Sequence, residues 1–360
     1  MNIILFIVIL AVLVFVHELG HFLAAKKFRI KVSEFGIGFP PKIWSRKKGE
    51  TLYSVNAIPF GGFVKILGEN PEEVGDEVEK ERNLIFKPKW VQIAVLAAGV
   101  AFNIIFAWLL ISFGFMTGLP SPVTEGENVE NPRLVITSVF PSSPAFEAGI
   151  KPGDAILEVY SQKNVLNEIS PTSVSNFIEA HGREEIIFVH QRGKETLTSK
   201  TFPEEGLVEG RRAIGISMDM IGTLSLPPHK ALWRGLETTK DLTIAIAVGL
   251  GQFLMEAFTG RADFSQITGP VGIVGLVGDV SQLGWIFILS FTAFISINLA
   301  LINLLPFPAL DGGRILFVIV EAIKGSPIKP KVANTLNGVG FVILIILMIV
   351  VTFHDIVKLF

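Results

Sequence analysis

The sequence predicts a polytopic α-helical membrane protein with four transmembrane helices and one soluble α+β domain inserted between the second and the third. Half of the 360 residues are hydrophobic and only 18% are charged, whereas soluble chains carry about 25% charged residues. The apolar residues gather in runs long enough to cross a hydrocarbon core of about 30 Å. Between the second and third runs the composition becomes that of a soluble domain.

The first apolar run covers residues 3–25. A cleaved signal peptide is the competing interpretation, but it requires positive charge ahead of the run, and here the charges follow it. Eight Lys and Arg residues against the single acid Glu34 lie between Lys26 and Lys48. The positive-inside rule places this loop in the cytosol and the N-terminus outside. The sequence therefore predicts a retained first span.

Three further spans are expected at about 90–116, 283–305 and 339–353. Basic residues between the last two predict a second cytosolic loop, namely Arg314, Lys324, Lys329 and Lys331. The stretch 242–258 is nearly long enough to be a fifth span but contains Gln252 and Glu256. A fifth crossing would move those lysines outside, so we interpret 229–282 as an interfacial or re-entrant segment, although partial insertion stays open.

The inserted domain spans 118–228, after a first membrane region at 1–117 and before the last one at 283–360. It holds 15 acidic against 9 basic residues and short β-branched runs such as "RLVITSVF" and "EEIIFVHQR". Its acidity fits the outer side of the membrane. The net charge of −2 offers no case for nucleic acid, and the absence of cysteine excludes disulfides, thiolate-bound zinc and a thiol nucleophile.

Two histidines and a glutamate lie inside the first span, in "LVFVHELGHFLAAKK". His17 and His21 are four residues apart, so on a helix they share one face and can meet one tetrahedral Zn²⁺. Glu18 beside them can act as the base for a water molecule, as in the His-Glu-x-x-His pattern of zinc hydrolases. Chance, or a polar patch that holds helices together, is the alternative explanation. Ionisable groups inside a span are usually functional, which favours the metal.

A catalytic zinc usually has three protein ligands and an open fourth position. The best third donor is Asp311 in "LINLLPFPALDGGR", directly after the third span and towards the cytosolic side. The prolines stop the helix, and Gly312 and Gly313 would let the backbone turn the carboxylate inward. An Asp in an ordinary Asp-Gly-Gly turn is the alternative, but the matching depth favours the ligand role.

These motifs together resemble the site-2 protease family, in particular the RseP/RasP type of bacterial intramembrane zinc metalloprotease. The segments "VHELGHF", "FGIGFPPKIW", "YSVNAIPFGGFVKILGE", "AAGVAFNIIFA", "GPVGIV" and "NLLPFPALDGG" occur in the order expected for that family. One departure is Val100, where relatives often have proline. Asn103 follows it, and a buried asparagine that bridges helices explains this residue equally well.

The resemblance implies that His17, His21 and Asp311 hold one Zn²⁺ and that Glu18 activates the water. It further implies that Asn303 hydrogen-bonds the substrate backbone. A membrane-dipping β-hairpin at about 32–67, with Gly61 and Gly62, would hold an unwound substrate as an added strand. From the residues alone, this segment would be an ordinary hairpin.

Within the soluble domain, "SSPAFEAGIKPGDAILEV" and "RRAIGISM" resemble a circularly permuted PDZ domain. Whether such a domain would bind C-termini or act as a size filter stays open. The resemblance implies single-pass transmembrane substrates, of the anti-sigma factor or remnant signal peptide type, in the lipid of a bacterial cytoplasmic membrane.

Two hypotheses from other classes remain. The chain could be a membrane-anchored PDZ scaffold with a vestigial metal site, or a transporter with a polar core. A scaffold has no need for Glu18, a closed structural site would require a fourth protein ligand, and no internal repeat supports a transporter. The sequence therefore favours an intramembrane protease.

Overall fold

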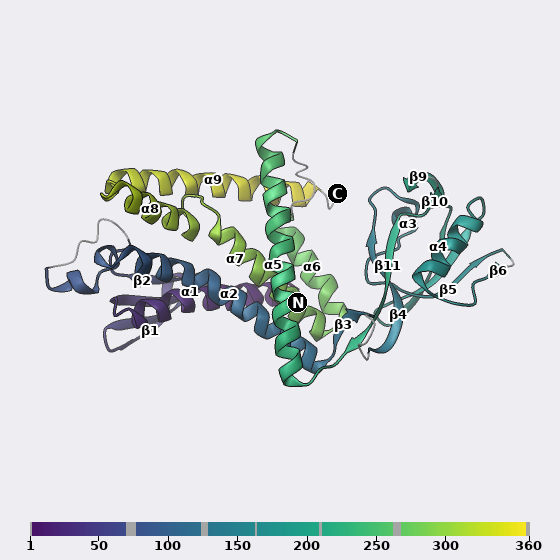
Figure 1. Ribbon diagram of the computed structural model, residues 1–360, viewed down its shortest axis with the longest axis horizontal. Helices are drawn as coiled ribbons and strands as arrows, with labels where there is room; N and C mark the ends of the chain where they lie inside the picture. The colour runs from purple at the N-terminus through teal and green to yellow at the C-terminus, as the bar shows by residue number, and fades with distance from the viewer. Residues whose placement is uncertain are drawn as a thin grey trace. The chain divides into compact units, whose positions relative to one another are not determined.

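The computed structural model describes residues 2–69, 77–123, 129–162, 164–208, 211–261 and 268–357. They form two compact units, one of residues 1–113 with 229–360, the other of residues 114–228 (Figure 1). The first unit holds most of the helices, and the second holds most of the strands. The chain leaves the helical unit once and returns to it.

Five described helices are long and apolar enough to cross a membrane. They are α1 (Asn2–Lys27), α2 (Lys89–Thr117), α5 (Pro228–Phe258), α7 (Trp285–Leu304) and α9 (Pro330–Val357). Four of them cover the runs predicted as spans, and α5 covers the ambiguous stretch. In Figure 1, α5 runs across the direction of α1, α2 and α9. Two shorter helices, α6 (Pro270–Leu283) and α8 (Asp311–Lys324), complete the helical unit.

The surface of α9 is apolar along most of its length. Phe341 and Ile349 are each 59% exposed, and most of the large apolar side chains around them are exposed as well. Continuous apolar surface of this extent is rare on soluble proteins and is typical of a surface that faces lipid.

Helix α1 is central to the packing of the first unit. Its N-terminal half packs Ile9 and Leu13 against Val277 of α6. Its C-terminal half packs Ala25 against the strands and α2. A Cβ atom on Gly20 would lie 2.8 Å from the carbonyl carbon of Ala98, so only glycine lets α1 and α2 approach this closely.

The strands β1 (Val32–Lys48) and β2 (Thr51–Ile66) form a sheet that is folded back on itself. Phe35 has Tyr53 as its partner on one side and Val64 on the other, so the first half of β1 lies between the two halves of β2. The second half of β1 pairs with the first half of β2. Among the described residues, the segment 62–66 has a partner strand on one side only. It therefore forms an open edge.

Glu34 ties this edge to the rest of the sheet. Burial opposes its ionisation, but the Ser54 hydroxyl, which donates at 2.7 Å, and the ammonium groups of Lys65 and Lys42, each at 3.2 Å, hold the pKa of Glu34 below its ordinary value. Lys65 belongs to the edge segment, so this ion pair links the edge to the neighbouring part of β1.

The second unit is an α+β domain. Its main sheet has the order β3-β11-β4-β5-β7-β8, with β6 paired to β5, and β9 and β10 form a separate hairpin. Helix α4 (Pro171–Ala180) buries Val174, Phe177 and Ile178 in the domain core. The remaining elements are β3 (Leu119–Pro122), β4 (Glu130–Val139), α3 (Pro144–Glu147), β5 (Ala155–Ser161), β6 (Asn164–Val165), β7 (Ile186–Arg192), β8 (Glu195–Thr201), β9 (Glu204–Val208), β10 (Arg211–Ala213) and β11 (Ile216–Leu224). Two short 3₁₀ helices, η1 (Glu77–Arg82) and η2 (Leu84–Phe86), precede α2 in the first unit.

Candidate metal centre

His17, His21 and Asp311 converge inside the helical unit. The two histidines are buried on one face of α1, and Asp311 is the first residue of α8. The Oδ2 atom of Asp311 lies 3.0 Å from Nε2 of His17 and 3.3 Å from Nε2 of His21, and the two Nε2 atoms are 3.2 Å apart. Among the described residues, no other group of three His, Asp or Glu side chains comes this close together.

The arrangement fits a zinc ion. Zn²⁺ binds imidazole nitrogen and carboxylate oxygen at about 2.0–2.2 Å in tetrahedral geometry, which places neighbouring ligand atoms about 3.3 Å apart. The three observed separations lie between 3.0 and 3.3 Å. Three protein donors of this kind leave a fourth coordination position open, as catalytic zinc sites do.

The Asp-Gly-Gly sequence does not form the turn that was predicted for it. It is instead the first turn of α8. A Cβ atom on Gly312 would overlap the carbonyl groups of Leu304 and Leu305. The glycines therefore allow α8 to begin directly against the end of α7, and this close packing holds Asp311 at the histidines.

The far nitrogen of each histidine ring also has a partner. Nδ1 of His21 lies 2.9 Å from the carbonyl oxygen of Val95. A carbonyl can only accept, so Nδ1 of His21 carries a proton, and Nε2 is the ring nitrogen that can bind a metal. Nδ1 of His17 lies 3.3 Å from the side-chain amide of Asn103, which is fully buried. Both partners belong to α2, which thus orients the two rings.

Helix α2 also provides the space for the rings. A Cβ atom on Gly99 would overlap Nε2 of His21 and would lie 2.7 Å from Cε1 of His17. Sequence reasoning missed Gly99 and Val95 and interpreted Asn103 only as a possible bridge between helices. The run of small residues in "LAAGVAF" was the available signal, because small residues mark close helix contacts in membranes.

Glu18 faces the open edge of the sheet. A Cβ atom on Gly62 would lie 3.3 Å from Cγ of Glu18, so the edge segment passes directly beside the glutamate. The Glu18 carboxylate is half-buried and makes no hydrogen bond with the described residues. Gly61 has a φ of +115°, and a Cβ atom there would overlap the ring of Phe39, so this position requires glycine.

Asn303 lies apart from these contacts. It is half-buried in the last turn of α7, and no described residue hydrogen-bonds its amide. The structure thus brings together His17, His21 and Asp311 and places Gly62 against Glu18. It leaves the Asn303 amide free to accept or donate elsewhere.

Comparison with known proteins identifies the family of the chain. The model of peptidase family M50 matches residues 5–347. The chain is 36% identical to the protein FN1322 of Fusobacterium nucleatum, over the full length of both chains. It is 32% identical to the regulator of sigma-W protease RasP of Bacillus subtilis, with 100% of this chain and 99% of that one covered. It is 31% identical to the zinc metalloprotease RasP of Geobacillus kaustophilus, with 100% and 98% covered. The chain therefore belongs to peptidase family M50, the site-2 protease family, and is a zinc-dependent protease.

Proposed function

We propose that this protein cleaves the membrane-spanning segments of single-pass proteins, with one Zn²⁺ held by His17, His21 and Asp311. The observation that carries the proposal is the meeting of these three side chains at 3.0–3.3 Å, with Asp311 coming 294 residues after His17 in the chain. His17 and His21 lie in α1, which is apolar enough to cross a membrane, and Asp311 follows α7, which is also long and apolar enough. A peptide that reaches the three side chains therefore comes from the membrane.

Glu18 acts as the general base and acid. A zinc ion in the site would supply Lewis acidity towards the scissile carbonyl and would lower the pKa of a water molecule. Glu18 takes a proton from the attacking water and delivers it to the amide nitrogen that leaves. Its carboxylate is suited to this exchange because no described residue occupies its oxygens with a hydrogen bond.

The open edge of the sheet holds the substrate. A transmembrane helix hides its carbonyl groups in its own hydrogen bonds, and once unwound it needs replacement partners. Segment 62–66 has a partner strand on one side only, so its other side offers them by strand addition. The closeness of Gly62 to Glu18 sets the bound chain beside the base. Asn303 contributes a hydrogen bond to the substrate backbone.

The topology that fits best has α1, α2, α7 and α9 as spans and α5 along the interface. Its support is the direction of α5 across the other helices (Figure 1), together with the basic residues that follow α1 and those within and after α8. In this arrangement the N-terminus and the PDZ-like domain at 118–228 lie outside a bacterial cytoplasmic membrane. The metal centre lies towards the cytosol. The domain acts on substrates such as anti-sigma factors or remnant signal peptides, as a filter or a recognition module.

The test compares the purified wild type with Glu18→Gln on a single-pass model substrate in detergent or lipid vesicles. We expect cleavage by the wild type alone, loss of cleavage with a chelator, and zinc content unchanged in Glu18→Gln because Glu18 is not a ligand. Equal cleavage by both proteins, or stoichiometric zinc with no cleavage of any single-pass substrate, would overturn the proposal. The second outcome would favour a membrane-anchored scaffold.

A further inference from the structure

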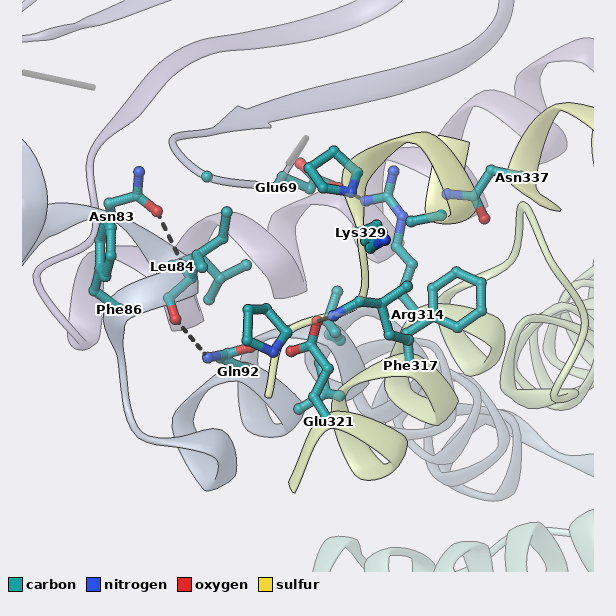
Figure 2. Close-up of a pocket in the computed structure, with 18 residues that line it drawn as sticks. Glu69, Asn83, Leu84, Phe86, Gln92, Arg314, Phe317, Glu321, Lys329 and Asn337 are labelled. Carbon is teal, nitrogen blue, oxygen red and sulfur yellow. Dashed lines mark hydrogen bonds and ion pairs between the residues drawn. The ribbon is translucent and has the colours of Figure 1, made fainter. Parts of the chain in front are cut away.

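A cavity of about 380 Å³ lies in the helical unit beside the proposed metal centre. Figure 2 shows its two sides, with Asn83, Leu84 and Phe86 on one and Arg314, Phe317 and Glu321 of α8 on the other. Helix α2 and the start of α9 complete the lining. Its volume falls in the range of small-ligand pockets, roughly 300–1,000 Å³.

Three of the four charged residues of the cavity wall, Glu69, Arg314 and Glu321, are already paired. Arg314 forms an ion pair with Glu69, and Glu321 pairs with Lys89 and also accepts a hydrogen bond from the backbone of Ile328 at 2.9 Å. The side-chain amide of Gln92 donates to two backbone carbonyls, those of Ile85 and Lys87.

The remaining wall is mostly apolar, and Lys329 is exposed to solvent. A polar occupant would lose its hydration here and would find few new partners among the described residues of the wall. The chemistry of the cavity therefore selects an apolar occupant.

Three parts of the cavity lining lie close in sequence to residues of the proposed metal centre or to the open edge. Arg314 is one helical turn after Asp311 in α8. Leu96 follows Val95, whose carbonyl orients His21. Gly68 and Glu69 follow the open edge segment 62–66 after one intervening residue. A chain added to that edge at Gly62, beside Glu18, and running towards Ile66 is therefore directed into this cavity.

We propose that the cavity is a substrate subsite that receives one large apolar side chain from the cytosolic flank of the cleaved bond. The proposal rests on the proposed function, because it requires the substrate to lie along segment 62–66. The first cavity residue beyond the edge, Gly68, comes six residues after Gly62, and an added strand advances with its partner at about 3.3 Å per residue. The side chain therefore comes from one of the first six residues on that flank. Leu, Met or Phe matches the apolar wall and the transmembrane origin of the substrate.

The test fills the cavity and measures specificity. Ala333 is buried and lines it, so Ala333→Phe places a ring inside. The matched control is Val332→Phe, the same new ring at an exposed neighbouring position that does not line the cavity. The substrates are a single-pass segment with Phe or Gly at each of the six flank positions, and cleavage is located by mass spectrometry.

At one position, we expect the wild type to prefer Phe over Gly, and Ala333→Phe to lose about tenfold or more in kcat/KM for the Phe substrate only. Val332→Phe keeps the wild-type preference. A second variant, Phe317→Ala, enlarges the cavity and raises the relative rate for Trp at the same position. It keeps the test valid if the filled variant does not fold.

Two results would overturn the subsite. One is equal losses for Phe and Gly substrates at every position in Ala333→Phe, with no gain for Trp in Phe317→Ala. The other is a wild type without preference at any of the six positions. Absence of zinc-dependent cleavage by the wild type would instead contradict the proposed function, so the two failures are distinguishable.

Discussion

The side-chain amide of Asn103 lies 3.3 Å from Nδ1 of His17, and its Oδ1 atom has no hydrogen-bond partner among the described residues. A rotation of the side-chain amide by 180° exchanges Oδ1 and Nδ2, and only the hydrogen-bond network assigns which atom is which. When Nε2 of His17 binds a metal, its Nδ1 carries the proton and needs an acceptor. With Oδ1 turned towards His17, Asn103 satisfies both groups.

Asn103→Ala is therefore expected to weaken zinc binding by about 10–100-fold, the usual cost of losing an outer hydrogen bond to a ligand histidine. The measurement is zinc affinity by competition with a chelator. The control is Asn298→Ala, because among the described residues Asn298 donates only to the Phe294 carbonyl of its own helix. Wild-type affinity in Asn103→Ala would show that the amide serves only to bridge helices.

Gly99→Ala should abolish the metal centre. The new methyl group would overlap Nε2 of His21, and α1 and α2 would have to separate to admit it. We expect loss of stoichiometric zinc and of zinc-dependent cleavage. Gly249→Ala in α5 is the control, because no described residue comes within 4 Å of a Cβ atom there, and alanine in a helix is favoured over glycine by roughly 0.5–1 kcal/mol. Full zinc content in Gly99→Ala would contradict the close approach of α2.

Asp355 joins the end of α9 to the start of α6. Its buried carboxylate accepts hydrogen bonds from the backbone N–H groups of Gly269, at 3.0 Å, and Gly272, at 2.8 Å. Loss of a capping carboxylate costs about 0.5–2 kcal/mol. Asp355→Ala should therefore lower the melting temperature of the protein in detergent. Asp219→Ala, which removes an exposed contact to a neighbouring backbone group, should leave it nearly unchanged, and equal melting temperatures for both variants would refute the role.

The second unit should lose stability in mild acid. Burial lowers the pKa of His190, and the positive charge of Arg192 lowers it further. The carboxylate of Asp154, whose Oδ2 lies 3.0 Å from Nδ1 of His190, raises this pKa, but by less than burial lowers it. The folded domain thus favours neutral His190. The resulting stability is present above the ordinary histidine pKa of about 6.5 and is lost as the pH falls below it.

Hydrogen exchange on the full chain measures this effect. After correction for the intrinsic exchange rate, amides of β5 and β7 should be less protected at pH 5.5 than at pH 7.5. His190→Gln should remove most of the difference, because glutamine does not titrate. Protection that is constant in the wild type, or that rises as the pH falls, would be incompatible with a buried neutral histidine.

Sequence alone was sufficient for the features that depend on local physics. A run of apolar residues as long as 3–25 has to form a helix in lipid, where every backbone group needs an internal partner. The spacing of His17 and His21 places them on one face of that helix whatever surrounds it. The side of the membrane assigned to Asp311 followed from charge and topology, and the structure brings Asp311 to both histidines.

Only the tertiary structure decided what surrounds those three side chains. The Val95 carbonyl, Gly99 and Asn103 meet the rings of α1 from a helix that begins more than 60 residues later. No local pattern marks such contacts, because they depend on how closely two helices pack. The folding of β1 and β2 into a sheet with an open edge at 62–66 is likewise set by pairing between distant segments. The sequence by itself predicted the apolar helices and the metal-binding pattern, and long-range packing decided the geometry that orients the three side chains.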